Sequence, residues 1–243
     1  MKHLLRISMA LSLAVIAGSC TSIKSAKVNE LDHVAVVNIS VDNHVDMSGF
    51  VGLVAFAEEM AKSGEFDLSD VTENMHGEVF NRYAGKFPFS ILPEEKVIGS
   101  TSYSDYVQRD TRSAIARNQK YQSYQGYHVL HARKYNERKI QQLFNVLPPE
   151  TDAVLFVNAF YTLKKQAVSY GTGTAKIRAN LDMMLINREG DVIMKVLVSD
   201  YSEDLIKFAL SGSEMDTYKV REMCVDATNS ALEKANNFFI KKF

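Results

Sequence analysis

The chain has 243 residues, of which 46% are hydrophobic and 23% are charged, and its formal net charge is −1. This length fits one large domain or two small ones, and the apolar share is large enough for a real core. The nearly balanced charge argues against a protein that binds nucleic acid through a basic surface.

The first twenty residues have the layout of an export signal. Lys2 and Arg6 form a short positive region, an apolar run extends over 7–17, and small residues lead to Cys20. These three features together define a secretory signal peptide, and the apolar run is too short to span a bilayer comfortably. We therefore expect residues 1–19 to be removed during export, the alternative being a buried N-terminal helix.

The residues that end this leader, Ala17-Gly18-Ser19-Cys20, resemble the lipobox of bacterial lipoproteins. In that family the signal is cut before the cysteine, which then carries the lipid, so the resemblance implies lipidation of Cys20. Acyl chains anchor a protein by burying their methylene groups in the bilayer. The family prefers leucine where this chain has Ala17, so ordinary cleavage, which would release a soluble periplasmic or secreted protein, stays open.

Cleavage before Cys20 sets the properties of the mature chain. It removes two bases and no acid, which leaves 26 lysines and arginines against 29 acidic residues. If Cys20 carries lipid, Cys224 has no disulfide partner, whereas an unmodified Cys20 makes a Cys20–Cys224 bridge conceivable. We expect residues 20–31 to form the lipidated cysteine and a polar tether, followed by a single α/β domain over 32–243.

The first half of the chain alternates strand and helix patterns. Residues 33–41 are β-branched and apolar, which predicts a buried strand. Residues 48–62 place apolar side chains at helical spacing, which predicts a helix packed on a sheet, although insertion into a membrane or a partner is an alternative. Three further elements are predicted: a helix over 67–83 that Gly85 ends, a strand over 87–92 and a charge-rich helix over 104–120.

The second half carries the clearest patterns. Asn136 is a good N-cap for a helix over 137–147, and the near-continuous apolar run over 152–161 predicts a central strand. Apolar and polar residues alternate strictly over 174–187, which predicts a strand with one buried face and one wet face. Three elements complete the chain: a glycine-containing turn over 187–190, a partner strand over 192–198 and a final helix from Ser213 to Phe238.

This order predicts an α/β (α+β) fold with one mixed sheet of about four to six strands, which contains a long antiparallel hairpin over 174–198 and is flanked by helices. The stretch from Gly126-Tyr127 through the helix at 137–147 and the segment TDAVLFV at 151–157 to that hairpin resembles a group of envelope lipoproteins. Their domain is similar to the amino-terminal domain of the Tol-system propeller protein. The group includes lipoprotein activators of penicillin-binding proteins and the curli secretion channel lipoprotein.

The resemblance covers roughly residues 32–240 and implies an assembly or secretion role in the envelope. Its motifs have low specificity, because many α/β domains contain them. Curli-type channels also need additional amphipathic hairpins that cross the membrane, and the sequence contains no convincing pair. The channel branch of the group is therefore the less well supported one.

The chain offers few candidates for chemistry. His128 and His131 could be metal ligands, but a surface or capping role is the simpler reading of that spacing. Asp42, His44 and Asp46 alternate after the first strand and are typical of a solvated loop. The glycine-rich segment 171–174 leads into a strand instead of a helix, unlike a phosphate loop. Cys224 lies on an apolar helix face, where a thiol behaves as a small hydrophobe. We therefore predict no catalytic residue, no metal site and no cofactor.

One region has an unusual composition. Residues 103–139 contain six of the eleven tyrosines and eight bases against three acids. Tyrosine and arginine are enriched where proteins bind proteins, because each combines apolar area with directed hydrogen bonds. An anionic glycan or an acidic partner would also suit this region, and a solvated helix with tyrosines that brace a long loop is the alternative to binding. The predicted partner-binding residues are Tyr103, Tyr106, Arg109, Arg112, Tyr121, Tyr124 and Tyr127.

The sequence therefore supports two functional hypotheses. The first is a non-enzymatic, lipid-anchored envelope protein of the outer membrane, facing the periplasm, that binds a protein or a cell-wall component. The second is a subunit of a secretion or assembly pore, in which 48–62 contacts the membrane or neighbouring subunits. A hydrolase is the weakest reading and would require a deep pocket around His128 or Asp42.

Overall fold

The structure is a computed structural model. It describes residues 21–50, 53–62, 66–111, 121–130, 136–169, 172–209 and 215–243. Cys20, the leader before it and Arg112 lie outside these ranges. None of the helices within them is both long enough and apolar enough to span a membrane.

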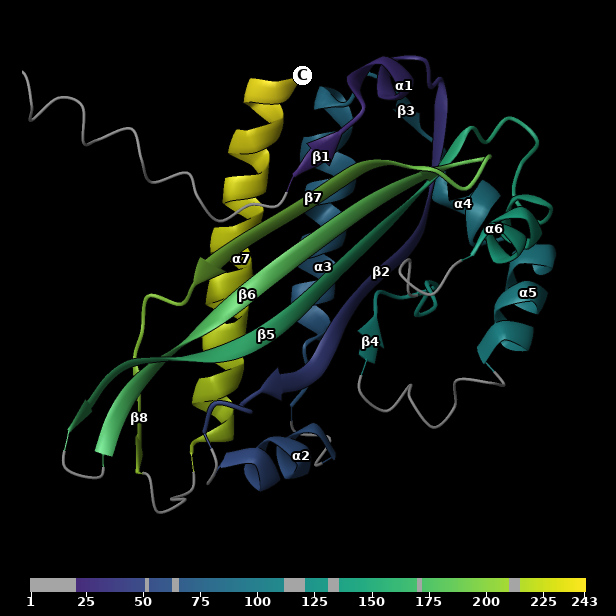
Figure 1. Ribbon diagram of the computed structural model, residues 1–243. Coiled ribbons are helices and arrows are strands. Elements are labelled where there is room, and N and C mark those ends of the chain that lie inside the picture. Colours follow the sequence, from purple (N-terminus) through teal and green to yellow (C-terminus); the bar gives the residue numbers. More distant parts are fainter. Residues whose placement is uncertain are drawn as a thin grey trace, which may run out of the picture.

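Eight strands of the described chain form one mixed sheet (Figure 1). Its main path runs β1-β7-β6-β5-β2-β3, with β4 beside β2 and β8 beside β6. β2 pairs in parallel with β3 and β5, and all other pairs are antiparallel. The strands are β1 (Ser22–Ile23), β2 (His33–Asp46), β3 (Ser90–Ile91), β4 (Tyr121–Ser123), β5 (Ala153–Ser169), β6 (Thr172–Asn187), β7 (Val192–Tyr201) and β8 (Ile206–Ala209).

Helices cover the two faces of this sheet unequally (Figure 1). α7 (Thr217–Lys242) and α3 (Ser69–Gly77) lie along one face, and α3 continues as a π-helical turn over Glu78–Tyr83. α4 (Glu94–Val97), α5 (Thr101–Thr111) and α6 (Glu137–Phe144) lie on the other face, near the start of β2 and β5. The remaining elements are α1 (Ser25–Asn29), α2 (Val54–Lys62) and a 3-10 turn over Ala84–Lys86.

Each face of the sheet has its own buried cluster, because successive side chains of a strand point to opposite faces. Leu155 and Leu181 belong to the larger cluster, which includes the apolar side of α7. Phe156 and Met184 belong to the smaller cluster beneath α4, α5 and α6. The smaller cluster covers only part of its face.

The predicted α/β class with one mixed sheet is confirmed, and so are the long antiparallel hairpin and its turn. Gly190 closes that turn with a φ of +87°, a conformation that glycine adopts without steric cost. Asn136 caps α6 as expected, since its side chain accepts a hydrogen bond from the backbone N–H of Lys139 at 3.0 Å. The sheet has more strands than expected because β1, β3, β4 and β8 are only two to four residues long.

Several predicted boundaries were wrong for identifiable reasons. The strand expected over 87–92 shortens to β3, because only Ser90 and Ile91 pair with a neighbouring strand, opposite His33 and Val34 of β2. The last helix begins at Thr217, where Asp216 accepts hydrogen bonds from two backbone N–H groups. The helix expected over 48–62 begins at Val54.

The polar tether expected over 20–31 is also corrected. Ser22 and Ile23 pair with Lys195 and Met194 at the edge of β7, and α1 follows directly. Val28 is fully buried in the larger cluster. Residues 22–29 therefore belong to the fold, because they complete a sheet edge and contribute to its core.

Candidate binding surface

One half of the sheet face that α4, α5 and α6 share is left open by the described helices. The buried cluster beneath these helices ends at Phe156 of β5 and Met184 of β6. Beyond that point the same face of β5, β6 and β7 carries mostly polar side chains. We call this surface the open face; it consists of Asn158, Phe160, Thr162, Lys164, Lys176, Arg178, Asn180, Asp182, Leu197, Ser199 and Tyr201.

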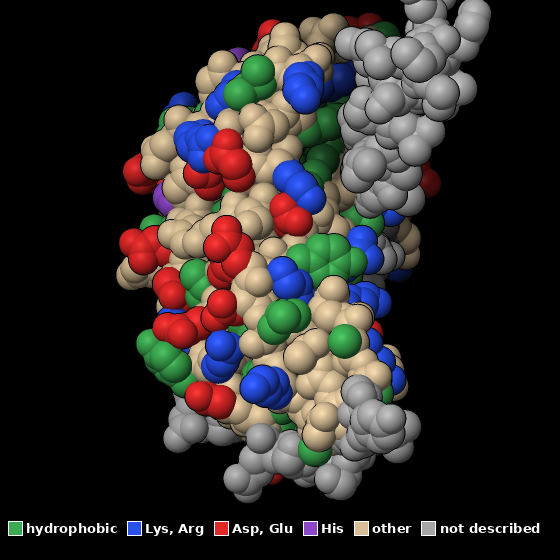
Figure 2. Space-filling model, turned by 90° about the vertical axis from the view of Figure 1, so that its left-hand side faces the viewer, with side chains coloured by type: hydrophobic (Ala, Val, Ile, Leu, Met, Phe, Trp, Pro, Cys, Tyr) green, Lys and Arg blue, Asp and Glu red, His purple; other side chains and the backbone are tan. Residues whose placement is uncertain are grey.

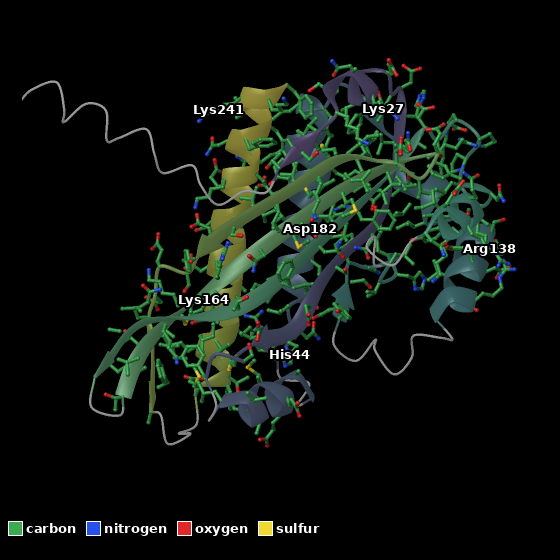
Figure 3. All side chains as sticks on the ribbon, viewed as in Figure 1. Lys27, His44, Arg138, Lys164, Asp182 and Lys241 are labelled. Atoms are coloured by element: carbon green, nitrogen blue, oxygen red, sulfur yellow. The ribbon has the colours of Figure 1, made fainter. Side chains whose placement is uncertain are left out.

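The register of the strands places these residues in rows. Asn158 lies opposite Asp182, Thr162 opposite Arg178, and Lys164 opposite Lys176. Residues that lie directly opposite each other in an antiparallel pair share one face, with Cβ atoms about 4.5–5.5 Å apart. Figure 3 shows Asp182 and Lys164 at separate points along the sheet, with Arg138 far away on α6.

Side-chain amides begin the open face, next to the covered half. The Asn38 amide donates to the hydroxyl of Ser40 and to Oδ1 of Asn158, at 3.1 and 2.9 Å. Its own carbonyl accepts from the backbone N–H of Leu130 at 2.9 Å. These bonds hold Asn158 in one orientation. Among the residues described, the Asn158 Nδ2 group donates to no acceptor, so it is available to a ligand.

The next two polar residues are more buried than the alternating pattern predicted. Asn180 and Asp182, expected on a wet face, are each only 6% exposed. Asn180 accepts a hydrogen bond from Ser199 at 2.8 Å and donates to the backbone carbonyl of Phe160 at 3.3 Å. Hydrogen bonding within the sheet offsets the cost of burying this amide.

Three cations occupy the far part of the open face. Lys164, Lys176 and Arg178 are half-buried, and none forms a salt bridge within the described ranges. Like charges directly opposite each other in a sheet destabilise the pairing of the two strands. The Lys164–Lys176 pair therefore lowers the stability of the hairpin, and the fold does not require it.

Arg178, on the same face as these lysines, has one donor that is unsatisfied among the described residues and an aromatic neighbour. Its Nε is buried without a hydrogen-bond partner in the described structure. Its guanidinium carbon lies 6.0 Å from the ring centroid of Tyr201, which is itself 41% exposed. An aromatic ring at this distance attracts a cation and restrains its position.

The nearest carboxylate on the neighbouring strand is already engaged. Asp46 lies opposite Thr162 and accepts a hydrogen bond from the backbone N–H of Ser48 at 2.9 Å. Hydrogen bonding from Ser48 holds the pKa of Asp46 below its usual value, with a smaller contribution from Lys164. The open face thus presents more donors and positive charge than acceptors in this part.

Three of the tyrosines predicted to bind a partner are buried. Tyr103 is fully buried and donates a hydrogen bond to the Val37 carbonyl at 2.7 Å. Tyr106 and Tyr127 are 8% and 4% exposed. Burial raises the pKa of both Tyr103 and Tyr127, so their hydroxyls stay protonated. These three side chains brace the core and are not displayed to a partner.

The other members of that region are dispersed. Tyr121 and Tyr124 are half-buried beside β2, Arg109 is exposed on α5, and Arg112 lies outside the described residues. Tyr124 stacks on His76 with ring centroids 4.1 Å apart, and the His76 ring hydrogen-bonds Glu94 at 2.8 Å. The structure does not gather the predicted residues into one surface patch.

The other sequence candidates do not converge either. Burial lowers the pKa of His128, which is half-buried, and His131 lies outside the described residues. Asp42 and His44 belong to β2 instead of a loop, and Asp42 accepts from the His44 backbone N–H at 2.8 Å. No group of three or more potential metal ligands occurs among the described residues. Cys224 is fully buried, and burial raises the pKa of its thiol.

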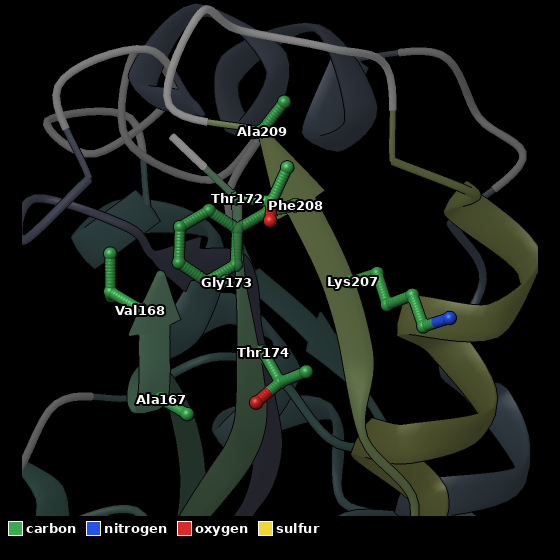
Figure 4. Close-up of a pocket in the computed structure, with 8 residues that line it drawn as sticks. All are labelled: Ala167, Val168, Thr172, Gly173, Thr174, Lys207, Phe208 and Ala209. Atoms are coloured by element: carbon green, nitrogen blue, oxygen red, sulfur yellow. The ribbon is translucent and has the colours of Figure 1, made fainter. Parts of the chain in front are cut away.

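A separate hollow lies at the tip of the β5–β6 hairpin, where β8 pairs with β6 (Figure 4). It has a volume of about 510 Å³ and is lined by Val168, Thr172, Phe208 and their neighbours. The Phe208 ring lies against Gly173, where an added Cβ would be 2.5 Å from the ring. The hollow is mostly apolar, unlike the open face.

The sequence patterns alone could not locate the open face. The alternation over 174–187 placed Lys176 and Arg178 on one face of a strand, but Lys164 comes from a segment with no clear periodicity. Comparison with models of known protein families finds no match, and comparison with curated proteins finds no significant similarity. The assignment of a function therefore depends on the geometry of the chain itself.

Proposed function

We propose that this protein is a lipid-anchored envelope lipoprotein that binds an anionic glycan of the cell envelope through the open face, without catalysing a reaction. The observation that carries this proposal is the group of Lys164, Lys176 and Arg178, which form no salt bridge with any described residue, on a sheet face that the described helices leave uncovered.

The first argument concerns cost. A Lys164–Lys176 pair weakens the hairpin, and replacing either lysine by a neutral residue would remove that repulsion. Proteins often retain locally unfavourable groups where activity requires them. An anionic ligand between the two lysines would turn the repulsion into two favourable contacts, which explains the arrangement.

The second argument concerns the ligand class. Lysine, arginine and the Asn158 amide all donate hydrogen bonds, and a guanidinium matches the planar geometry of a carboxylate or a sulfate-like group. Tyr201 adds an exposed ring beside Arg178. Donors, an aromatic ring and a shallow surface suit an extended polymer that carries both hydroxyl and acidic groups. An acidic glycan meets all of these requirements.

Binding of a defined polymer tests the proposal. The protein spanning 21–243 is titrated with polygalacturonate as an anionic probe and with dextran as a neutral control. We expect salt-dependent binding to polygalacturonate alone, and the double variant Lys164→Gln/Lys176→Gln should bind roughly tenfold more weakly.

A matched control removes the same charge elsewhere. The double variant Lys96→Gln/Lys219→Gln alters two exposed lysines outside the open face, each paired with a single acid. It should bind polygalacturonate like the unchanged protein. Equal weakening by both double variants, equal affinity for dextran, or selective capture of an envelope protein through the open face would each contradict glycan binding.

Mass spectrometry of the mature N-terminus, combined with membrane fractionation, tests the anchor independently. We expect a chain that begins at Cys20 and carries acyl mass. A native protein that begins at Met1 without added mass would contradict both export and lipidation.

A subunit of a secretion or assembly pore is a second candidate, and one observation favours it. The β5–β6 hairpin extends past the helices to a tip with an apolar hollow, and Val168 there is 50% exposed (Figures 1 and 4). The expected contact through 48–62 has less support, because Leu53, Ala57 and Met60 pack into the larger cluster. A strictly monomeric protein in detergent would exclude this alternative.

A further inference from the structure

We propose that the end of the domain formed by β1, α1 and the last turn of α7 rests on the bilayer that holds the Cys20 lipid. This inference rests on the proposed lipidation, but it is independent of glycan binding. It concerns orientation: a short anchor and a matching surface would fix which end of the molecule meets the membrane.

The anchor is short because the fold begins almost at once. Ser22 and Ile23 pair with β7, and the backbone N–H of Lys24 donates to the Ile193 carbonyl at 2.9 Å. An extended chain spans at most about 3.6 Å per residue. Cys20 is two residues before Ser22, so its α-carbon must be within about 7 Å of the sheet edge.

The charges of the two segments at this end are of one sign. Residues 21–29 contain Lys24 and Lys27, residues 234–243 contain Lys234, Lys241 and Lys242, and the nearest acids along the chain are Glu30 and Glu233, which flank these segments. Lys27 and Lys234 pair with aspartates, whereas Lys24, Lys241 and Lys242 form no salt bridge within the described residues. Three cations are therefore available to lipid phosphates.

Apolar side chains accompany these lysines. Ile240 in the last turn of α7 and Phe243 just after it are 58% and 39% exposed. Lysine stems can lie along a hydrocarbon surface while their charged ends stay in water, so this mixture suits the interface of a bilayer. Figure 3 shows Lys241 and Lys27 at the same end of the molecule, where α7 ends and α1 lies (Figure 1).

The flank of the molecule lacks this character. In the view of Figure 2, lysine and arginine side chains are intermixed with aspartate and glutamate over most of the surface. Such a surface has no field of one sign to attract an anionic membrane. The location of the anchor and the charge of the two terminal segments together favour the end over the flank, and a bilayer over a second copy of the chain.

The experiment uses the thiol of Cys20 itself. The mature chain, residues 20–243, is coupled through Cys20 to a maleimide-headgroup lipid in vesicles of phosphatidylcholine and phosphatidylglycerol. Cys224 should not react, because it is fully buried and its thiolate is disfavoured. Chemical coupling makes the test independent of whether cells lipidate the protein.

Single tryptophans report the orientation, because the chain contains none. Ile240→Trp places the probe at the proposed membrane end. Tyr218→Trp is the matched control, since Tyr218 is 64% exposed at the opposite end of α7, about 33 Å away along the helix axis. Brominated lipids should quench the membrane-end probe at least about twofold more strongly than the control probe and shift its emission to the blue.

The outcomes are separable. Equal quenching of the two probes, or stronger quenching of the control probe, would overturn the orientation even if Cys20 is lipidated in cells. A second copy of the chain would cover this end if lipid did not quench the membrane-end probe and analytical ultracentrifugation detected a dimer. That result would also overturn the proposed orientation.

A separate variant tests whether the three lysines attract the anionic membrane. In the Ile240→Trp background, the triple change Lys24→Gln/Lys241→Gln/Lys242→Gln should reduce quenching of the tryptophan on anionic vesicles, because it removes the three available cations. Unchanged quenching would contradict the role of these lysines.

Discussion

The covered and open halves of one sheet face are built on the same strands and differ in only a few side chains. Under α4, α5 and α6, β5 and β6 contribute Phe156 and Met184, both buried. Two residues away on each strand, the same face carries Asn158 and Asp182. In this sheet the described helices extend only as far as the apolar side chains do, and the polar half of the same face stays outside their cover.

The largest expected effect comes from the covered half. Phe156→Ala removes a fully buried ring from beneath three helices and should lower the free energy of unfolding by about 3–5 kcal/mol. Urea denaturation measures this loss. Val168→Ala, at a half-exposed position on the hairpin tip, is the control and should change stability little. A loss below about 1 kcal/mol for Phe156→Ala would mean that the helices do not depend on this cluster.

A smaller effect is expected in the covered half at the point where the pairing of β2 with β5 is irregular. The register of β2 against β5 skips Val37. The backbone carbonyl of Val37 instead accepts a hydrogen bond from the Tyr103 hydroxyl. Tyr103→Phe leaves that buried acceptor without a donor and should cost about 1–3 kcal/mol. Chemical denaturation checks the value. If Tyr103→Phe weakened binding of a partner by more than its loss of stability explains, a binding role for this tyrosine would be supported again.

On the open half, stability and binding should change in opposite directions. Lys176→Glu converts the repulsive pair with Lys164 into an attractive one and should stabilise the fold by roughly 0.2–1 kcal/mol. The same change should abolish polygalacturonate binding, because it places a negative charge among the donors. Thermal unfolding and the titration are measured on the same sample. A less stable variant, or one that still binds, would contradict the functional reading of the pair.

The smallest expected effect is a pH dependence near the boundary between the halves. Burial lowers the pKa of His128 below 6.5 in the folded protein, so the unfolded chain binds the proton more readily. Stability should therefore rise as the pH increases towards 6.5, and it should fall on acidification below that value. His128→Gln should flatten this part of the stability profile. An identical profile in the variant would assign the dependence to other groups.

The elements with strong periodicity were predictable from the sequence. The alternation over 174–187, the Asn136 cap and the glycine of the β6–β7 turn each depend on local chemistry, and each is found. The short strands β1, β4 and β8 were missed, because each exists only through its pairing with a longer strand. Tyr103, Tyr106 and Tyr127 were misassigned for a related reason: composition does not show which rings the core requires.

The open face itself needed the structure. Pairing Lys164 with Lys176 depends on the register of β5 against β6 and on an irregularity between Lys165 and Ala167. One residue of slip would send Lys164 to the opposite face. Sequence patterning identified two of the three cations, Lys176 and Arg178 on β6, and gave no means of finding Lys164 on β5.

The position of β1 has a practical consequence for anyone who shortens the protein. Its two residues close part of the β7 edge, and Val28 fills a place in the core just after it. A truncated chain that starts at Asp32 would expose unpaired backbone along β7, the kind of edge through which proteins aggregate. We therefore expect residues 22–28 to protect the β7 edge from self-association, and an affinity tag should precede Thr21 and not replace it.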